Sequence, residues 1–147
     1  MNPELTNAIF ARFPLIFRNR NLPPPLGLPF GFDFYTGDAC EGWFRILERV
    51  FARLEAVCQQ QLNESVAEDA LISVIEVFQK SGVLRIRLHP IGAKRDPEIF
   101  AAIEEAVEAS KVTCLFCGAV GVLRMDTDWH RVSCSDCEAK CAKEGKF

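Results

Sequence analysis

Two cysteine pairs in the last third of the chain restrict its fold more than any other feature. Cys114 and Cys117 form one CxxC motif, Cys134 and Cys137 form another, and sixteen residues separate the motifs. A CxxC turn offers two thiolates along one edge of a tetrahedron, so two such turns supply the four ligands of a structural Zn²⁺ ion. Because the protein fills all four positions, water and substrate find none open. The spacing therefore predicts a closed zinc site.

The residues between and around the pairs predict a zinc ribbon. Gly118 follows the first motif and can adopt a positive φ at little cost. Residues 120–125 and 129–133 are expected to form two short strands around a polar turn. His130 and Cys141 are spare candidate ligands nearby, but we expect a hairpin side chain and a packed or surface thiol on a short last helix, respectively.

Length and cysteine usage set the wider frame. A chain of 147 residues can bury one core and a small satellite. Its N-terminus lacks a basic start followed by a long apolar run, so we expect neither a signal peptide nor a membrane span. Seven cysteines is an odd number, and Cys40 and Cys58 lie far from the cluster. The combination indicates a reducing cytoplasm, where cysteine pairs bind metal.

The N-terminal part is expected to contain a helix and then an irregular arm. The helix runs from Pro3 to about Phe13. The arm, residues 21–34, contains four prolines and two glycines, which exclude a helix or a central strand. It also carries several large apolar residues, so it either lies against the body or covers a partner.

Periodic patterns in the middle of the chain predict the body. Apolar residues recur with helical spacing from Glu41 to about Leu62, and Cys58 falls on that apolar stripe. Residues 71–79 and 83–89 are predicted strands, joined by a turn at 80–82. A second helix follows Asp96 as its cap and ends near Ser110.

Together these elements predict an α+β fold. It consists of a long amphipathic helix packed with a small antiparallel sheet, plus a C-terminal four-cysteine zinc ribbon. We expect an N-terminal helix and arm over residues 1–36, the α+β body over 37–111, and the ribbon over 112–147. Because almost no linker separates the second helix from the first cysteine, we expect the ribbon to pack on the body.

Several motifs scattered along the chain form a pattern that is also found in other small proteins. Gly42 and Trp43 open the long helix, a strand with Glu76 and Phe78 leads to the sequence Gly-Val-Leu-Arg at 82–85, and the ribbon has the form CxxCGxxG…W…CxxC. Over residues 37–137 the chain resembles a group of small uncharacterised proteins common in phages and prophages. The resemblance implies a phage-like origin and a zinc ribbon, and no reaction. Three residues separate Phe78 from the glycine, so we expect a longer hairpin loop than in that group.

No signature of catalysis is present in the sequence. The two histidines, His89 and His130, belong to no motif for acyl transfer, phosphoryl transfer or metallohydrolysis. Asp33, Asp38 and Glu41 lie near a tyrosine and are interpreted as a solvated acidic loop in preference to a lined pocket. We therefore expect a protein that is not an enzyme.

The first functional hypothesis is binding to a protein. Residues 31–70 carry eight acidic side chains against three arginines, and the candidate acidic surface comprises Asp33, Asp38, Glu41 and Glu48. An acidic surface can compete for the basic groove of a nucleic-acid-handling complex. The expected partner is then a host nucleic-acid-handling or defence complex, inhibited in the manner of an anti-CRISPR protein.

The second hypothesis is nucleic-acid binding through the ribbon hairpin. It uses Arg124, Trp129, His130 and Arg131, since an aromatic ring beside cations suits a single strand. The net charge of −3 opposes this hypothesis, and Trp129 is alternatively part of the ribbon core.

A further cationic group lies on one predicted strand face and just beyond it. It comprises Arg85, Arg87, His89, Lys94 and Arg95. These residues either bind phosphate, RNA or an acidic protein patch, or protect an exposed strand edge from pairing. A homodimer formed through the helix stripe or the apolar arm is a further alternative.

Overall fold

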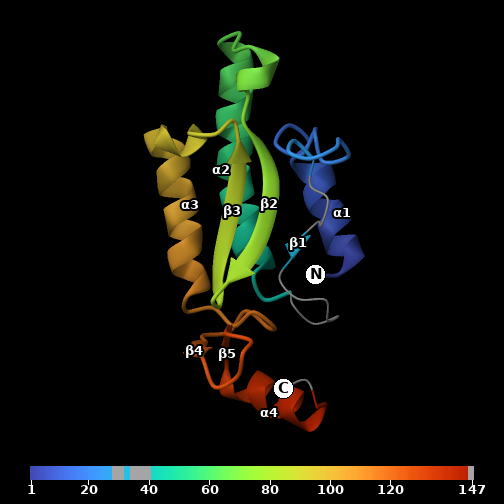
Figure 1. Cartoon of the computed structure of the whole chain (residues 1–147), viewed down its shortest axis with the longest axis vertical. Helices are drawn as coiled ribbons and strands as arrows, with labels where there is room; N and C mark the ends of the chain where they lie inside the picture. Colours follow the sequence, from blue (N-terminus) through green and yellow to red (C-terminus); the bar gives the residue numbers. More distant parts are fainter. Residues whose placement is uncertain (28–31, 34–40, 146–147) are drawn as a thin grey trace.

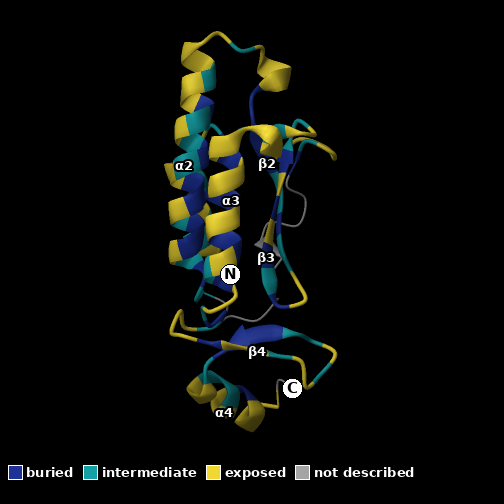
Figure 2. Ribbon diagram, turned by 90° about the vertical axis from the view of Figure 1, so that its left-hand side faces the viewer, coloured by how far each residue is buried: buried dark blue, intermediate teal, exposed yellow. Residues whose placement is uncertain are grey.

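Two helices cover one face of a small sheet in the computed structural model, which describes residues 1–27, 32–33 and 41–145 (Figures 1 and 2). The helices are α2 (Phe44–Asn63) and α3 (Pro97–Ser110). The sheet contains β1 (Phe32–Asp33), β2 (Ser73–Lys80) and β3 (Val83–His89), in that order. A second sheet of two strands and a last helix extend the molecule at one end (Figure 1). The predicted α+β fold with a C-terminal cysteine cluster is confirmed.

Helix α2 buries the apolar stripe that its sequence predicted. Its buried residues are Ile46, Leu47, Val50, Phe51, Leu54 and Cys58. The helix begins at Phe44, three residues later than predicted. The reason lies outside the helix, because the Gly42 N–H donates to the Leu115 carbonyl (2.8 Å) and holds the preceding residues against the ribbon.

Strands β2 and β3 form an antiparallel hairpin with a tight turn. Lys80 pairs with Val83, and Ser81 and Gly82 form the turn with φ values of +53° and +81°. The Gly82 N–H also donates to the Gln79 side chain (2.7 Å). The expected longer loop is therefore wrong, since residues 79 and 80 extend the strand instead of the turn. The parallel pairing of β1 with β2 had no signal in the sequence.

Helix α3 has the predicted bounds and the predicted cap. The Asp96 carboxylate accepts hydrogen bonds from the N–H groups of Glu98 (2.9 Å) and Ile99 (3.3 Å). These bonds satisfy two of the amides that a helix leaves free in its first turn. On the solvent side, Arg53 of α2 forms ion pairs with Glu98 and with Glu105, which connects the two helices.

The C-terminal part contains β4 (Val122–Arg124), β5 (Arg131–Ser133) and α4 (Ser135–Lys143). Both strands are shorter than predicted. Val120 forms an isolated bridge with Thr113 instead of extending β4, and it is 84% exposed. Residues 126–129 form bends between the two strands, so β5 begins at Arg131 instead of Trp129.

The N-terminal helix α1 (Pro3–Arg12) has nearly the predicted bounds, and the segment after it reaches into the core. Phe13, Ile16 and Phe17 are buried, and the Phe17 ring meets the Phe51 ring edge-on at 5.0 Å. The apolar residues predicted for the arm at 28, 30 and 34 lie outside the described residues.

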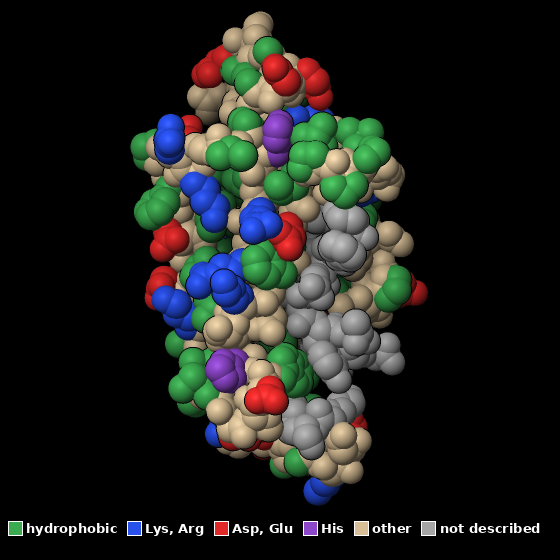
Figure 3. Space-filling model, viewed as in Figure 1, with side chains coloured by type: hydrophobic (Ala, Val, Ile, Leu, Met, Phe, Trp, Pro, Cys, Tyr) green, Lys and Arg blue, Asp and Glu red, His purple; other side chains and the backbone are tan. Residues whose placement is uncertain are grey.

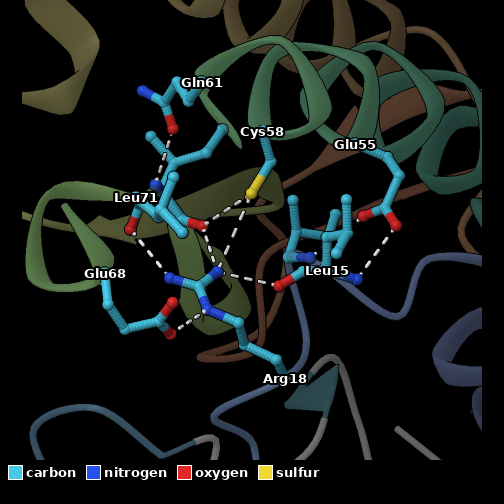
Figure 4. Close-up of polar contacts among 9 residues, drawn as sticks. Leu15, Arg18, Glu55, Cys58, Gln61, Glu68 and Leu71 are labelled. Atoms are coloured by element: carbon cyan, nitrogen blue, oxygen red, sulfur yellow. Dashed lines mark hydrogen bonds and ion pairs between the residues drawn. The ribbon is translucent and has the colours of Figure 1, made fainter. Parts of the chain in front are cut away.

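Arg18 fastens this N-terminal segment to the body (Figure 4). Its guanidinium donates to the carbonyls of Leu15 (2.8 Å), Leu71 (3.0 Å) and Ile72 (2.7 Å) and pairs with Glu68 (3.0 Å). Beside it, the Glu55 carboxylate accepts the backbone N–H groups of residues 15 and 16, each at 2.9 Å. These two charged side chains thus provide hydrogen-bond partners for backbone N–H and C=O groups that lie outside any helix or sheet.

None of the helices among the described residues combines the length and apolarity that spanning a membrane requires.

Replacing Arg18 with alanine should lower the free energy of unfolding by about 2–3 kcal/mol, because three backbone carbonyls lose a charged donor. Chemical denaturation measures this loss. Arg12→Ala is the matched control. Its side chain is 60% exposed, pairs with Glu48 and lies over the Phe13 ring, so its loss should cost about 1 kcal/mol at most. Equal losses in the two variants would contradict the assigned role of Arg18.

Candidate metal centre

The sulfur atoms of Cys114, Cys117, Cys134 and Cys137 converge in the C-terminal part. All four Sγ atoms lie within 4.8 Å of one another, and those of Cys117 and Cys134 are 3.7 Å apart. A tetrahedral ion with metal–sulfur bonds of about 2.3 Å would separate its ligands by about 3.8 Å. The four cysteines are therefore positioned to bind a metal ion.

The first CxxC motif forms a tight knuckle. Cys114 is fully buried, its N–H donates to the Ala119 carbonyl (2.7 Å), and its carbonyl accepts the Gly118 N–H (2.9 Å). Gly118 has a φ of +81°, the left-handed conformation expected from the sequence. The Ala119 backbone N–H donates a hydrogen bond to the Cys117 sulfur, which lowers the pKa of this thiol. Desolvation and the neighbouring Cys114 and Cys134 thiols outweigh that hydrogen bond, so the pKa of Cys117 is raised.

The second CxxC motif starts helix α4. Cys134 is the N-cap, and its sulfur accepts the Cys137 N–H at 3.5 Å. This backbone hydrogen bond lowers the pKa of Cys134 to about 7. Burial, reinforced by the neighbouring thiols, raises the pKa of Cys137. One sulfur thus ionises readily, while its neighbour resists ionisation.

Four cysteines clustered this closely cannot all ionise without a cation. Negative charges packed this closely repel one another, so the protein alone cannot stabilise four thiolates. A divalent cation removes that repulsion and deprotonates its thiol ligands. The donor set therefore fits a thiophilic metal ion.

The knuckle is joined to the beginning of α2 through Gly42 and Trp43. The Trp43 indole N–H donates to the Thr113 carbonyl (2.9 Å), and its side chain is fully buried. A Cβ at Gly42 would lie 2.0 Å from the Cys114 carbonyl oxygen, so only glycine permits this approach. The Gly-Trp motif therefore contacts the knuckle of the CxxCG motif, about seventy residues away in the sequence.

Arg131 does not lie on the predicted nucleic-acid surface. Its side chain is completely buried, and its guanidinium donates two parallel hydrogen bonds to the Glu138 carboxylate (2.8 and 2.7 Å). It also donates to the Thr127 hydroxyl and the Trp129 carbonyl. The prediction that Arg131 belongs to an exposed binding surface is wrong, because this arginine connects the hairpin to α4.

The remaining residues of the predicted hairpin surface are only partly accessible. The Trp129 ring meets the Phe116 ring edge-on at 5.9 Å and packs against the core, as the alternative interpretation held. Arg124 and His130 are half-buried. Neither His130 nor the buried Cys141 of α4 belongs to the sulfur cluster.

The predicted acidic surface is not gathered into one site among the described residues. Glu48 forms an ion pair with Arg12, and Glu41 is half-buried beside the knuckle. Asp33 is on β1, and its side chain lies outside the described atoms, as does the whole of Asp38.

The strand cations, in contrast, do gather on one face. Arg85 and Arg87 are exposed on β3, and the 3₁₀ turn that follows, η2 (Ala93–Arg95), adds two more exposed cations. His89 is half-buried at the end of the strand. Figure 3 shows Lys and Arg side chains collected on this side of the molecule. Arg87 pairs with Glu76 at 2.8 Å and lies over the Phe78 ring.

Cys114→Ser should weaken metal affinity by more than about 100-fold, because it removes one of the four sulfur ligands. Chelation and this variant should both unravel the ribbon while the α2 helix largely survives. Metal analysis and hydrogen exchange of the two regions measure these effects. Cys141→Ala is the matched control and should retain the metal. Full metal binding by Cys114→Ser would contradict the assigned site.

Gly42→Ala should cost about 2–3 kcal/mol of unfolding free energy, because its Cβ collides with backbone atoms of the knuckle. Gly145→Ala separates this collision from backbone strain: its φ is +67°, but no atom lies within 4 Å of the added carbon. That control should cost about 1 kcal/mol. Denaturant titration of both metal-loaded variants provides the comparison, and indistinguishable losses would argue against the close contact.

Comparison with known proteins gives no match to this chain, whether to family models, to curated proteins or to solved structures.

Proposed function

We propose that this protein is a non-enzymatic zinc-binding protein in which the ion has a structural role. The convergence of four cysteine sulfurs within 4.8 Å is the observation that supports this proposal. Four protein ligands complete a tetrahedral shell, so water and substrate have no access to the ion. The ion would then stabilise the knuckle instead of performing chemistry.

Zinc is the metal that best suits this donor set. Soft thiolate ligands select zinc, copper(I) or iron, and hard cations such as Mg²⁺ and Ca²⁺ prefer oxygen. A tetrahedral arrangement of four sulfurs is typical of structural zinc. Iron remains the competitor that the test must separate, because it also binds four cysteines.

The protein acts, in this proposal, by binding another protein in the cytoplasm. The resemblance to phage and prophage proteins favours an inhibitor of a host defence complex, such as an anti-CRISPR. The alternative, a nucleic-acid-binding hairpin, is weakened because Arg131 is buried and Trp129 is partly buried against the core. A ribbon docked on the body through Trp43 gives a partner a fixed surface to recognise.

Metal analysis of the purified protein tests the zinc assignment. We expect close to one zinc per chain and no visible absorbance from iron. Protein purified without added metal ions and then titrated with zinc should bind a single equivalent. Stoichiometric iron, or a fully folded ribbon with no metal, would overturn the assignment.

Affinity capture from a bacterial host lysate tests the protein-binding role. The metal-loaded protein should retain one defined partner, and the Cys114→Ser variant should lose it if the ribbon contributes to the surface. Titration with single- and double-stranded oligonucleotides at low salt is the parallel measurement. Tight, strongly salt-dependent binding of an oligonucleotide, with no captured protein, would favour the hairpin alternative.

A further inference from the structure

A pocket lies at the end of β3, remote in the fold from the cysteine cluster. Its volume is roughly 390 Å³, within the range of pockets that accept a ligand or a side chain. Most of its lining is aliphatic. The lining residues are Ile75, Arg87, Leu88, Pro90, Ile91, Gly92, Ala93 and Lys94.

Two irregularities of the backbone create this pocket. The pairing of β2 with β3 shifts between Val74 and Glu76, which leaves Ile75 as the extra residue of a bulge. After β3, Gly92 has a φ of +89° and directs the chain into η2. The intervening Ile91 is fully exposed at the rim of the pocket. The bulge and the left-handed glycine thus leave Ile91 in solvent and Ile75 half-buried at this end of the sheet.

Positive charge surrounds the apolar lining. Arg87 and Lys94 belong to the lining itself, Arg85 is exposed on the same strand face, and the Arg95 guanidinium lies beside Gly92. Desolvation lowers the pKa of Lys94, and although Glu104 opposes this shift, Arg85 and Arg87 add to it. Lys94 therefore lies close enough to Arg85 and Arg87 to be repelled by both.

Few carboxylates offset these cations. Among the described residues, Glu76 is the acidic partner of Arg87, and neither Arg85 nor Lys94 has a carboxylate oxygen within 4.0 Å. Arg85 and Lys94 thus lack an ion-pair partner among the described residues. Such cations beside an apolar pocket favour a ligand with complementary charge and an apolar anchor.

We infer that this pocket binds an acidic segment of a protein partner, with one bulky apolar side chain in the pocket and flanking carboxylates on Arg85, Arg87 and Lys94. The inference rests on the proposed protein-binding function and identifies the chemistry of the partner. It also reverses the expected polarity, since the protein presents the basic surface and the partner the acidic one.

The aliphatic lining decides between a peptide and a single-stranded nucleic acid. Nucleic-acid sites present aromatic rings on which bases stack. Near this pocket the Phe78 ring is already covered by the Arg87 guanidinium, 5.9 Å from its centroid. The net charge of −3 also gives the protein no general attraction for phosphate backbones.

Selection from a displayed library of random dodecapeptides, panned on the metal-loaded protein, tests the inference. We expect enriched peptides that combine at least two Asp or Glu residues with a bulky apolar residue. Lys94→Glu and Ile91→Ser should each weaken binding of such a synthetic peptide at least about tenfold. Lys143→Glu, an exposed lysine near the end of α4, is the charge-matched control and should change binding less than about twofold.

A chemical-shift titration with the same peptide adds a second measurement. We expect the largest shifts in the amides of Leu88, Ile91 and Ala93. Peptides that bind equally well to all three variants would overturn this site while leaving the protein-binding function intact. No enrichment together with an empty lysate capture would overturn both.

Two other ligands would also overturn the inference. One result is tight binding of oligothymidylate that Lys94→Glu abolishes, which would assign the surface to nucleic acid. The other is a dimer, seen by light scattering, that Lys94→Glu dissociates, which would assign it to a second copy of this chain. Thermal melts of each variant should match the parent, because the substituted side chains are exposed.

Discussion

The C-terminal part is organised around four cysteine sulfurs that converge on one point. Held within 4.8 Å of one another, these groups need a cation before all can ionise. The knuckle that holds two of them is also the surface on which α2 begins, through the Trp43 indole and the Thr113 carbonyl. A metal ion bound at this point would therefore stabilise the junction between ribbon and body as well as the ribbon itself.

The α+β body is stabilised by interactions that need no metal ion. Apolar burial between α2, α3 and the sheet supplies its core, and Arg18 attaches the irregular N-terminal segment by hydrogen bonds to backbone carbonyls. With helices on one face of the sheet, the opposite face keeps its cations in solvent (Figures 2 and 3). The cysteine cluster thus lies at one end of the molecule. The cations and the pocket of the proposed binding surface lie on β3 and η2.

Sequence patterns predicted those parts that local chemistry determines. The period of α2, the alternation of β3 and the Asp96 cap each depend on neighbours within a few residues, and all three are present in the structure. The cysteine spacing predicted the sulfur cluster for the same reason, because each knuckle is a local turn.

Contacts between distant residues were beyond the reach of these patterns. The sequence contains both the Gly-Trp motif and the CxxCG motif, but it does not show that they meet. Only the folded structure shows that the Cys114 carbonyl leaves no room for a side chain at Gly42. The sequence places Arg131 beside an aromatic residue and other cations, which suggests a binding surface, and only the folded structure brings Glu138 to it. The turn at 80–82 was predicted, but its tightness was not, because a non-glycine residue with positive φ such as Ser81 leaves no reliable signal.

Hydrogen exchange at the indole N–H of Trp43 tests most directly whether the metal holds the ribbon to the body. The chain has two tryptophans, so nitrogen–proton NMR spectra resolve this group from that of Trp129. The account predicts strong protection in the metal-loaded protein and its loss after chelation, because the Thr113 carbonyl belongs to the knuckle region. Undiminished protection of Trp43 in metal-free protein would contradict it.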